Sequence, residues 1–209
     1  MDLGLVKWLN GKVARCFPFD IMMDFICRFG HLAFIVYGIW LWFGGDGAER
    51  RKRREAALTA LFSVALCSCL SFLIGKVWAR PRPFTQDAAI WNFTAHKANA
   101  SFPSNHTMNA AAVSMVLLRT GMPGAIFMTG LAVVLAFSRM YAGIHYLTDL
   151  IGAVLLAAGV HMAVCRSRFL QMTARALAEI SLYIDFWRQG KMSPETRLAL
   201  RLLRGKRCM

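Results

Sequence analysis

The chain has 209 residues, of which 57% are hydrophobic and only 17% are charged, and its formal net charge is +14. This composition is too apolar for an ordinary soluble domain and indicates a protein embedded in a lipid bilayer. The basic residues are not gathered on one solvent-exposed surface, which argues against nucleic-acid binding. Basic residues beside apolar spans typically mark the cytoplasmic ends of membrane helices.

The first segment combines apolar and basic side chains at helical spacing. Between residues 3 and 16, Leu5, Leu9 and Val13 alternate with Lys7 and other basic residues. This pattern predicts an amphipathic helix that lies in the membrane interface and stops at Pro18.

Five apolar stretches follow, and a transmembrane helix needs about 20 such residues. They cover residues 25–43, 56–79, 107–118, 122–137 and 146–165. The third and fourth stretches are short unless they extend into their polar flanks. The predicted fold is all-α, a polytopic membrane helical bundle of about five transmembrane helices plus the N-terminal interfacial helix.

Basic clusters predict which ends of the spans face the cytoplasm. Residues 50–54 are all Arg or Lys, and further Lys and Arg follow Cys165, so both regions are expected on the cytoplasmic side. The polar loops 80–104 and 138–149 then share the outer side. We divide the chain into an interfacial helix, a membrane domain and a basic cytoplasmic tail, which cover residues 1–18, 19–165 and 166–209.

The two outer loops carry most of the polar groups near the membrane. Arg80, Arg82 and Arg139 are expected to meet His106 and His145 there. Ionisable side chains at membrane depth are costly, so their convergence predicts a functional site.

The basic residues suit an anionic phosphate group. The planar guanidinium groups of Arg82 and Arg139 can each donate two hydrogen bonds to phosphate oxygens, on which negative charge gathers in the transition state. Ser104 follows Pro103 at the expected start of a helix, where unpaired backbone N–H groups attract anions.

The histidines suit proton transfer and nucleophilic attack. His106 is placed to protonate a leaving oxygen, and His145 to attack phosphorus. Asp149 follows His145 by one helical turn and is placed to orient its imidazole.

Three short motifs carry a family resemblance. They are Arg82-Pro83, then Pro103-Ser104-Asn105-His106, then Ser138-Arg139 followed by His145 and Asp149. Together they resemble the signature of the type-2 phosphatidic acid phosphatase superfamily, which contains membrane lipid phosphatases. The resemblance implies that His145 is the nucleophile, Asp149 its partner and His106 the general acid. It also implies a phosphate site without metal or cofactor, formed by Arg82, Ser104, Asn105 and Arg139.

Two positions depart from the family pattern. Lys76 is separated from Arg82 by five residues, where the family usually has six. It remains a candidate phosphate ligand. Asn105 replaces the commoner glycine, and this Asn together with the RPRPF run resembles bacterial undecaprenyl-diphosphate phosphatases. The expected reaction is therefore hydrolysis of undecaprenyl diphosphate to undecaprenyl phosphate, in the bacterial inner membrane and facing outward.

Several alternatives stay open. Phosphatidylglycerophosphate, phosphatidate or lipid A phosphatase activity is compatible with the same motifs, as is phosphoryl transfer to another lipid. A zinc site formed by His96, His106 and His145 is a further alternative. A non-catalytic protein that binds or transports lipids would need the arginines but not an oriented histidine nucleophile.

Overall fold

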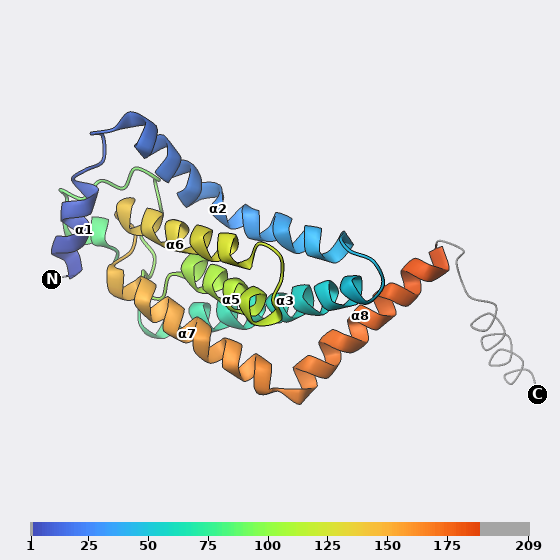
Figure 1. The fold of residues 1–209 in the computed structure, drawn as a ribbon. Coiled ribbons are helices and arrows are strands. Elements are labelled where there is room, and N and C mark those ends of the chain that lie inside the picture. Colours follow the sequence, from blue (N-terminus) through green and yellow to red (C-terminus); the bar gives the residue numbers. More distant parts are fainter. Residues whose placement is uncertain (1, 189–209) are drawn as a thin grey trace, which may run out of the picture.

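The computed structural model describes residues 2–188, and every regular element in that range is a helix (Figure 1). The elements are α1 (Asp2–Asn10), α2 (Phe17–Phe43), α3 (Gly47–Val77), α4 (Pro83–Gln86), α5 (Asn105–Thr120), α6 (Ala125–Tyr141), α7 (Leu147–Arg166) and α8 (Arg168–Arg188). Helices α2, α3, α5, α6 and α7 form the bundle, which confirms the predicted all-α membrane fold.

The five bundle helices coincide with the five predicted spans. By length and hydropathy α2, α3 and α7 are long enough to cross a membrane, and α6 is a shorter apolar helix. Helix α5 has 16 residues and packs against α3, α6 and α7 at the centre of the bundle. Because neighbouring helices surround α5, protein rather than lipid covers most of it, and polar residues at its start are tolerated.

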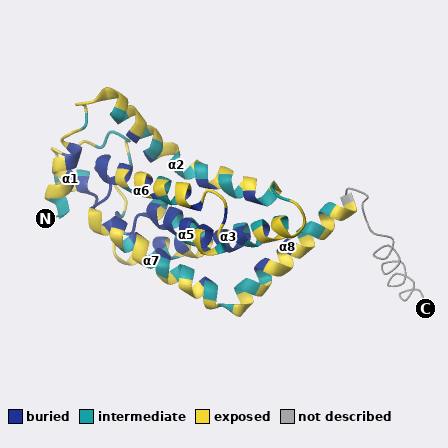
Figure 2. Ribbon diagram, viewed as in Figure 1, coloured by how far each residue is buried: buried dark blue, intermediate teal, exposed yellow. Residues whose placement is uncertain are grey.

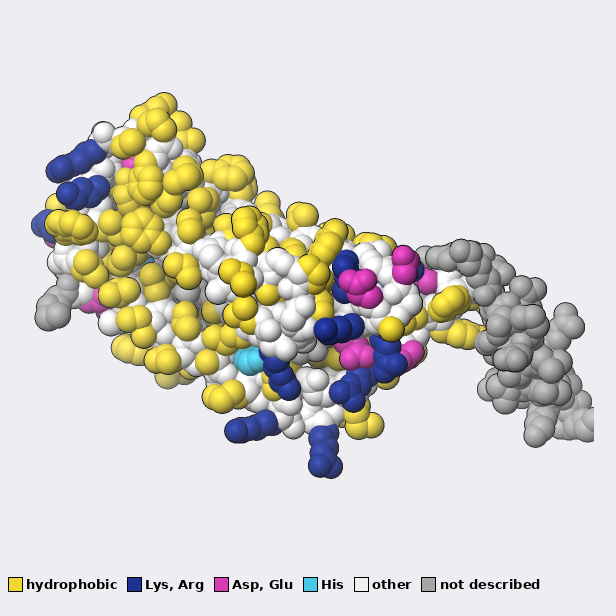
Figure 3. Space-filling model, in the orientation of Figure 1, with side chains coloured by type: hydrophobic (Ala, Val, Ile, Leu, Met, Phe, Trp, Pro, Cys, Tyr) yellow, Lys and Arg dark blue, Asp and Glu magenta, His cyan; other side chains and the backbone are white. Residues whose placement is uncertain are grey.

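The outer surface of the bundle is apolar along its length. Large side chains such as Phe25, Phe72, Phe127 and Leu155 are exposed, while the interior between the helices is buried (Figure 2). Figure 3 shows hydrophobic side chains along the flank and charged ones gathered toward the two ends of the molecule. Exposed apolar area on this scale fits a surface covered by lipid.

Small residues bring α5 and α7 close together. Ala111 and Ala112 of α5 pack with Ala153 and Ala157 of α7 in one buried cluster. Such residues allow helix backbones in a membrane to approach closely. The close approach holds the start of α5 beside the start of α7, where two of the three motifs lie.

The N-terminal helix differs from its prediction. It ends at Asn10, and Pro18 lies in the first turn of α2 instead of stopping α1. A proline is tolerated in the first helical turn, because the N–H it lacks has no partner inside the helix there. Val6 and Leu9 are buried against protein, in a cluster that includes Tyr141, so α1 caps one end of the bundle.

Part of the predicted basic tail is helix α8, and the rest, residues 189–209, lies outside the described residues. Arg54 ties α8 to the start of α3. Its Nε donates to the Trp42 carbonyl oxygen at 3.0 Å, its Nη1 to Ser181 Oγ at 2.9 Å, and it forms an ion pair with Asp185. The basic start of α3 and α8 therefore share one end of the bundle, and α1 lies at the other (Figure 1).

Candidate active site

The three motifs meet at the end of the bundle that α1 caps. The loop after α3, the start of α5 and the turn between α6 and α7 converge there (Figure 1). Five of the predicted residues are almost or completely inaccessible to solvent, namely Arg82, Ser104, Arg139, His145 and Asp149. Buried ionisable groups are retained only where partners or a ligand compensate for their desolvation.

His145 lies in the tight turn between α6 and α7. Gly143 makes this turn possible, because its φ is +70° and an added Cβ would approach Ile90 Cγ2 to 2.6 Å. The two ring nitrogens of His145 have different neighbours: Nε2 lies 3.3 Å from Arg82 Nη1, and Nδ1 lies 3.5 Å from Asp149 Oδ2. The second separation is long for a hydrogen bond, although such contacts often shorten when a substrate binds.

The environment of His145 favours a neutral ring. Burial lowers the pKa of the His145 imidazole to about 4, the neighbouring Asp149 opposes this shift, and the charge of Arg82 adds to it. A neutral imidazole keeps a lone pair at neutral pH, which nucleophilic attack requires.

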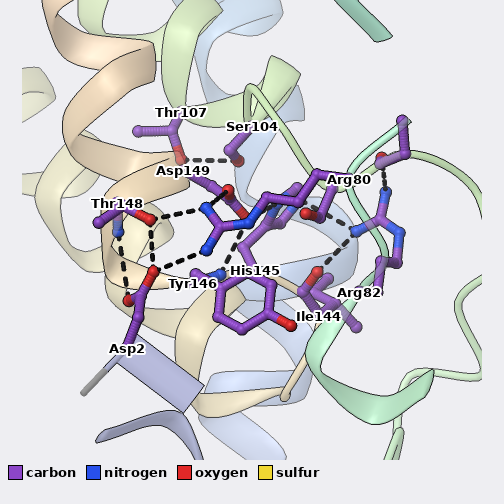
Figure 4. Close-up of polar contacts among 12 residues, drawn as sticks. Asp2, Arg80, Arg82, Ser104, Thr107, Ile144, His145, Tyr146, Thr148 and Asp149 are labelled. Atoms are coloured by element: carbon purple, nitrogen blue, oxygen red, sulfur yellow. Dashed lines mark hydrogen bonds and ion pairs between the residues drawn. The ribbon is translucent and has the colours of Figure 1, made fainter. Parts of the chain in front are cut away.

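Asp149 is held from three sides at the start of α7. Its Oδ2 accepts a hydrogen bond from the Tyr146 backbone N–H at 2.9 Å and faces His145. Its Oδ1 accepts from Arg80 Nη1 at 2.6 Å (Figure 4). Its orientation is therefore set before any substrate arrives.

Arg80 connects this carboxylate to helix α1. Besides Asp149, it donates to Thr148 Oγ1 at 2.7 Å and to Asp2 Oδ2 at 2.9 Å (Figure 4). Its guanidinium carbon lies 3.9 Å from the centre of the Tyr146 ring. A chain of polar contacts thus runs from Asp2 through Arg80 and Asp149 to His145.

Arg82 connects the loop between α3 and α5 to the turn that carries His145. Its Nη1 donates to the Ile144 carbonyl oxygen at 2.8 Å, and its Nε and Nη2 donate to Asn99 Oδ1 at 2.9 and 2.7 Å. Burial lowers the pKa of Arg82 to about 10, so the side chain is still charged at neutral pH. These contacts hold the Arg82 guanidinium in one orientation beside His145 Nε2.

The second motif forms the start of α5. Ser104 is the residue before the first helical turn, and its Oγ pairs with Thr107 Oγ1 at 3.0 Å. It makes no side-chain capping bond to the helix. The first N–H groups of α5 consequently have no partner inside the helix and are suited to an anion.

Arg139 differs from Arg82 in having an unused donor. It lies in the last turn of α6, and its buried Nε has no hydrogen-bond partner within residues 2–188. An unpaired buried donor is unusual and favours a site that binds an acceptor.

Comparison with known proteins decides the family. Residues 56–172 match the profile described as the PAP2 superfamily. The chain belongs to the PAP2 superfamily. This match covers all three motifs and confirms the resemblance inferred from them.

Relatives and solved structures agree with this assignment. The chain is 29% identical to the undecaprenyl-diphosphatase BcrC of Bacillus subtilis over 75% of its own length and 79% of that protein. It is 32% identical to the putative undecaprenyl-diphosphatase YbjG of Escherichia coli over 56% of each chain.

Two crystal structures share the PAP2 fold. One is Aquifex aeolicus LpxE, with a TM-score of 0.63, 20% identity and coverage of 79% of this chain and 95% of that chain. The other is the first transmembrane PAP2 type phosphatidylglycerolphosphate phosphatase from Bacillus subtilis. Its TM-score is 0.55 at 19% identity, over 79% of this chain and 88% of that one.

Lys76 does not join the other PAP2 motif residues. It is exposed near the end of α3, with its Nζ 5.5 Å from the centre of the Phe72 ring. Lys76 was a candidate because the family has a lysine before Arg-Pro, although the spacing to Arg82 is one residue shorter here. Within residues 2–188, no three His, Cys, Asp or Glu side chains are grouped so as to hold a metal ion, and this includes the three histidines of the zinc alternative.

Three residues near the PAP2 site lie outside the three sequence motifs and were not predicted to belong to the site. Asp2 and Asn99 hold Arg80 and Arg82, and His31 of α2 lies beside His106 with the ring centres 5.0 Å apart. Asp2 and His31 lie far from the motifs in sequence, and Asn99 is one of several polar loop residues. The sequence indicated His31 only by its unusual position, as a histidine inside an apolar span.

Proposed function

We propose that this PAP2 protein is a membrane lipid phosphatase that hydrolyses undecaprenyl diphosphate to undecaprenyl phosphate and inorganic phosphate. The observation that carries the proposal is the buried imidazole of His145, with Asp149 3.5 Å from Nδ1 and Arg82 3.3 Å from Nε2. Burial lowers the pKa of this imidazole, which favours the neutral form. A protein that only binds phosphate needs arginines and N–H groups but no oriented imidazole. The names of the BcrC and YbjG relatives support the choice of lipid.

The first step of the proposed reaction forms a phosphohistidine. His145 Nε2 attacks the terminal phosphorus, and the bond from that phosphorus to the bridging oxygen breaks. His106 must be protonated at this point, which the negative charge of the bound diphosphate favours. It gives that proton to the departing oxygen, so undecaprenyl phosphate leaves with the proton. Asp149 accepts a hydrogen bond from the Nδ1–H group and stabilises the positive charge that develops on the ring.

The second step regenerates the enzyme. His106, now without its proton, takes one from a water molecule as the water oxygen attacks phosphorus. The phosphorus–nitrogen bond breaks, inorganic phosphate departs and His145 returns to the neutral form. Arg82, Arg139, Ser104, Asn105 and the start of α5 are the proposed ligands for the phosphoryl oxygens, where charge gathers in both transition states.

An apolar cleft supports a lipid substrate. A cavity of about 590 Å³ lies between α2, α3 and α5. His106 and a few other polar side chains line one end of it, and mainly apolar side chains such as Phe34, Leu61 and Val113 line the remainder. A lipid chain in this cleft would place its head group beside the histidines while the rest of a long chain stays in the bilayer.

The substrate is tested by phosphate release from purified protein in detergent. We expect undecaprenyl diphosphate to give a higher kcat/KM than phosphatidylglycerophosphate, phosphatidate or lipid A 1-phosphate, with rates largely unchanged by EDTA. The chelator result follows because two arginines and a helix start already supply positive charge. A clear preference for a glycerol-based lipid phosphate would contradict the proposed substrate. Loss of activity with EDTA, restored by one divalent ion, would favour a metal-dependent reaction.

The proposed location is the bacterial inner membrane, with the site facing the periplasm or the cell exterior. The basic start of α3 and helix α8 lie at the end of the bundle opposite the site, and basic ends usually face the cytoplasm. Sidedness is tested in a variant whose native cysteines are replaced by alanine. We expect Ala98→Cys to react with a membrane-impermeant thiol reagent in intact cells and Ala48→Cys to react only after lysis. Both positions are exposed. The reverse pattern would place the site inside and contradict a role on outward-facing lipid carriers.

A further inference from the structure

The apolar cleft has a polar entrance that the catalytic steps above do not fully use. His31 of α2 and Asn105, His106 and Asn109 of α5 line the cleft, all at the end nearer the catalytic site. Farther along the same helices, the lining includes Leu41, Trp42 and Leu117. The cleft therefore changes from polar to mainly apolar with increasing distance from His145.

His31 is the unusual member of this entrance. Its ring lies nearly perpendicular to that of His106, at 78° with the centres 5.0 Å apart. Its Nδ1 atom is buried and has no hydrogen-bond partner within residues 2–188. A buried polar atom without a partner costs free energy, so its persistence points to a ligand that supplies the missing partner.

Asn109 adds a polar pair to the same wall. Its Nδ2 donates to Ser68 Oγ of α3 at 2.9 Å, and Ser68 Oγ lies 3.3 Å from Asn109 Oδ1. Asn105 precedes Asn109 by one helical turn and lines the same cleft. Polar side chains in a membrane bundle usually face the interior or a pathway for polar groups.

The substrate's own connectivity relates this entrance to the catalytic centre. In a lipid diphosphate, the phosphate that stays with the lipid lies between the terminal phosphate and the hydrocarbon chain. With the terminal phosphate at His145 and the chain in the apolar cleft, that retained phosphate must lie at the entrance. In a lipid monophosphate, an uncharged ester carbon would take this place.

We propose that His31 and Asn109, which lie beside the phosphoryl ligand Asn105, form a subsite for the retained phosphate and select diphosphates over monophosphates. The inference rests on the proposed function. As the bridging bond breaks, negative charge moves onto the retained phosphate beside His31. A donor there stabilises the transition state more than the bound substrate, and thus raises kcat for diphosphates in particular.

The test compares farnesyl diphosphate with farnesyl monophosphate, because the two differ only in the retained phosphate. His31→Leu should lower kcat/KM for the diphosphate by about 10- to 100-fold and change the monophosphate little. His31→Gln, which keeps a donor, should recover part of the loss. Activity on the monophosphate also reports that each variant is folded. Phe34→Leu is the matched control, since Phe34 lines the same cleft one turn farther along α2 and should affect both substrates alike.

The outcomes separate the subsite from the proposed function. Equal losses on both farnesyl substrates in His31→Leu, or no loss on the diphosphate, would overturn the subsite alone. The same holds if His31→Leu cleaves neither substrate and His31→Gln recovers both equally. If the wild-type protein cleaved glycerol-based lipid phosphates but neither farnesyl substrate, the proposed function and the subsite would both be overturned.

Discussion

His145→Gln should reduce turnover of every lipid phosphate by about 10⁴-fold or more, since removing a nucleophile leaves only the binding contribution to catalysis. Glutamine is similar in size to histidine but cannot form the covalent phosphoryl intermediate. The measurement is single-turnover release of labelled terminal phosphate. An alkaline quench should trap the phosphoenzyme in the wild-type protein and none in the variant.

A second histidine provides the control for this experiment. His161 lies on α7, where its Nε2 is 3.5 Å from Cys165 Sγ, and it has no proposed part in the reaction. His161→Gln should therefore keep near wild-type turnover and the trapped intermediate. Substantial activity in folded His145→Gln protein would show that another group attacks phosphorus, and the phosphohistidine mechanism would be wrong.

Arg139→Met should lower kcat by about 10²- to 10³-fold without lowering stability, because one oxyanion donor is typically worth that much. Arg139 is only 4% exposed, and its Nε is unpaired within residues 2–188. Replacing such a group with an apolar side chain of similar length removes its desolvation cost. We expect thermal unfolding in detergent at an unchanged or higher temperature, together with the loss of rate.

Arg54→Met is the matched contrast for Arg139. Arg54 is as deeply buried, at 2% exposure, but Trp42, Ser181 and Asp185 accept hydrogen bonds from its guanidinium. Breaking a buried pair leaves its partner uncompensated, so this variant should lose about 3 kcal/mol of unfolding free energy. Its kcat should change little, because α8 lies far from the site. If Arg139→Met were destabilised like Arg54→Met while keeping full activity, the arginine at 139 would be structural.

The two buried arginines, Arg54 and Arg139, differ in whether the protein itself supplies their hydrogen-bond partners. Both are buried within a protein that exposes an apolar flank, and both would be costly without a partner. At Arg54 the protein supplies the partners and thereby attaches α8 to α3. At Arg139 one donor is left for a ligand, which is the arrangement expected where the site must bind an anion reversibly.

The amino-acid sequence by itself determined the helices and the short-range parts of the site. The five apolar stretches predicted the bundle because burial in a bilayer depends on local hydropathy. His145 and Asp149 were predicted to meet because they are separated by one helical turn, and Ser104 was placed before α5 by the preceding proline. Each of these features depends on neighbouring residues alone.

Tertiary structure decided the pairings between distant segments. The sequence predicted that the outer loops would meet, but Asp2 reaches Arg80, and His31 reaches His106, only because α1 and α2 pack where they do. Lys76 was a candidate by its resemblance to the family lysine, yet α3 continues to Val77 and leaves it exposed, beside Phe72. Pro18 was expected to end the first helix but lies in the first turn of α2, because α1 already ends at Asn10, where it packs in a cluster with Tyr141. Such contacts depend on how whole helices pack, and no local spacing in the sequence records that packing.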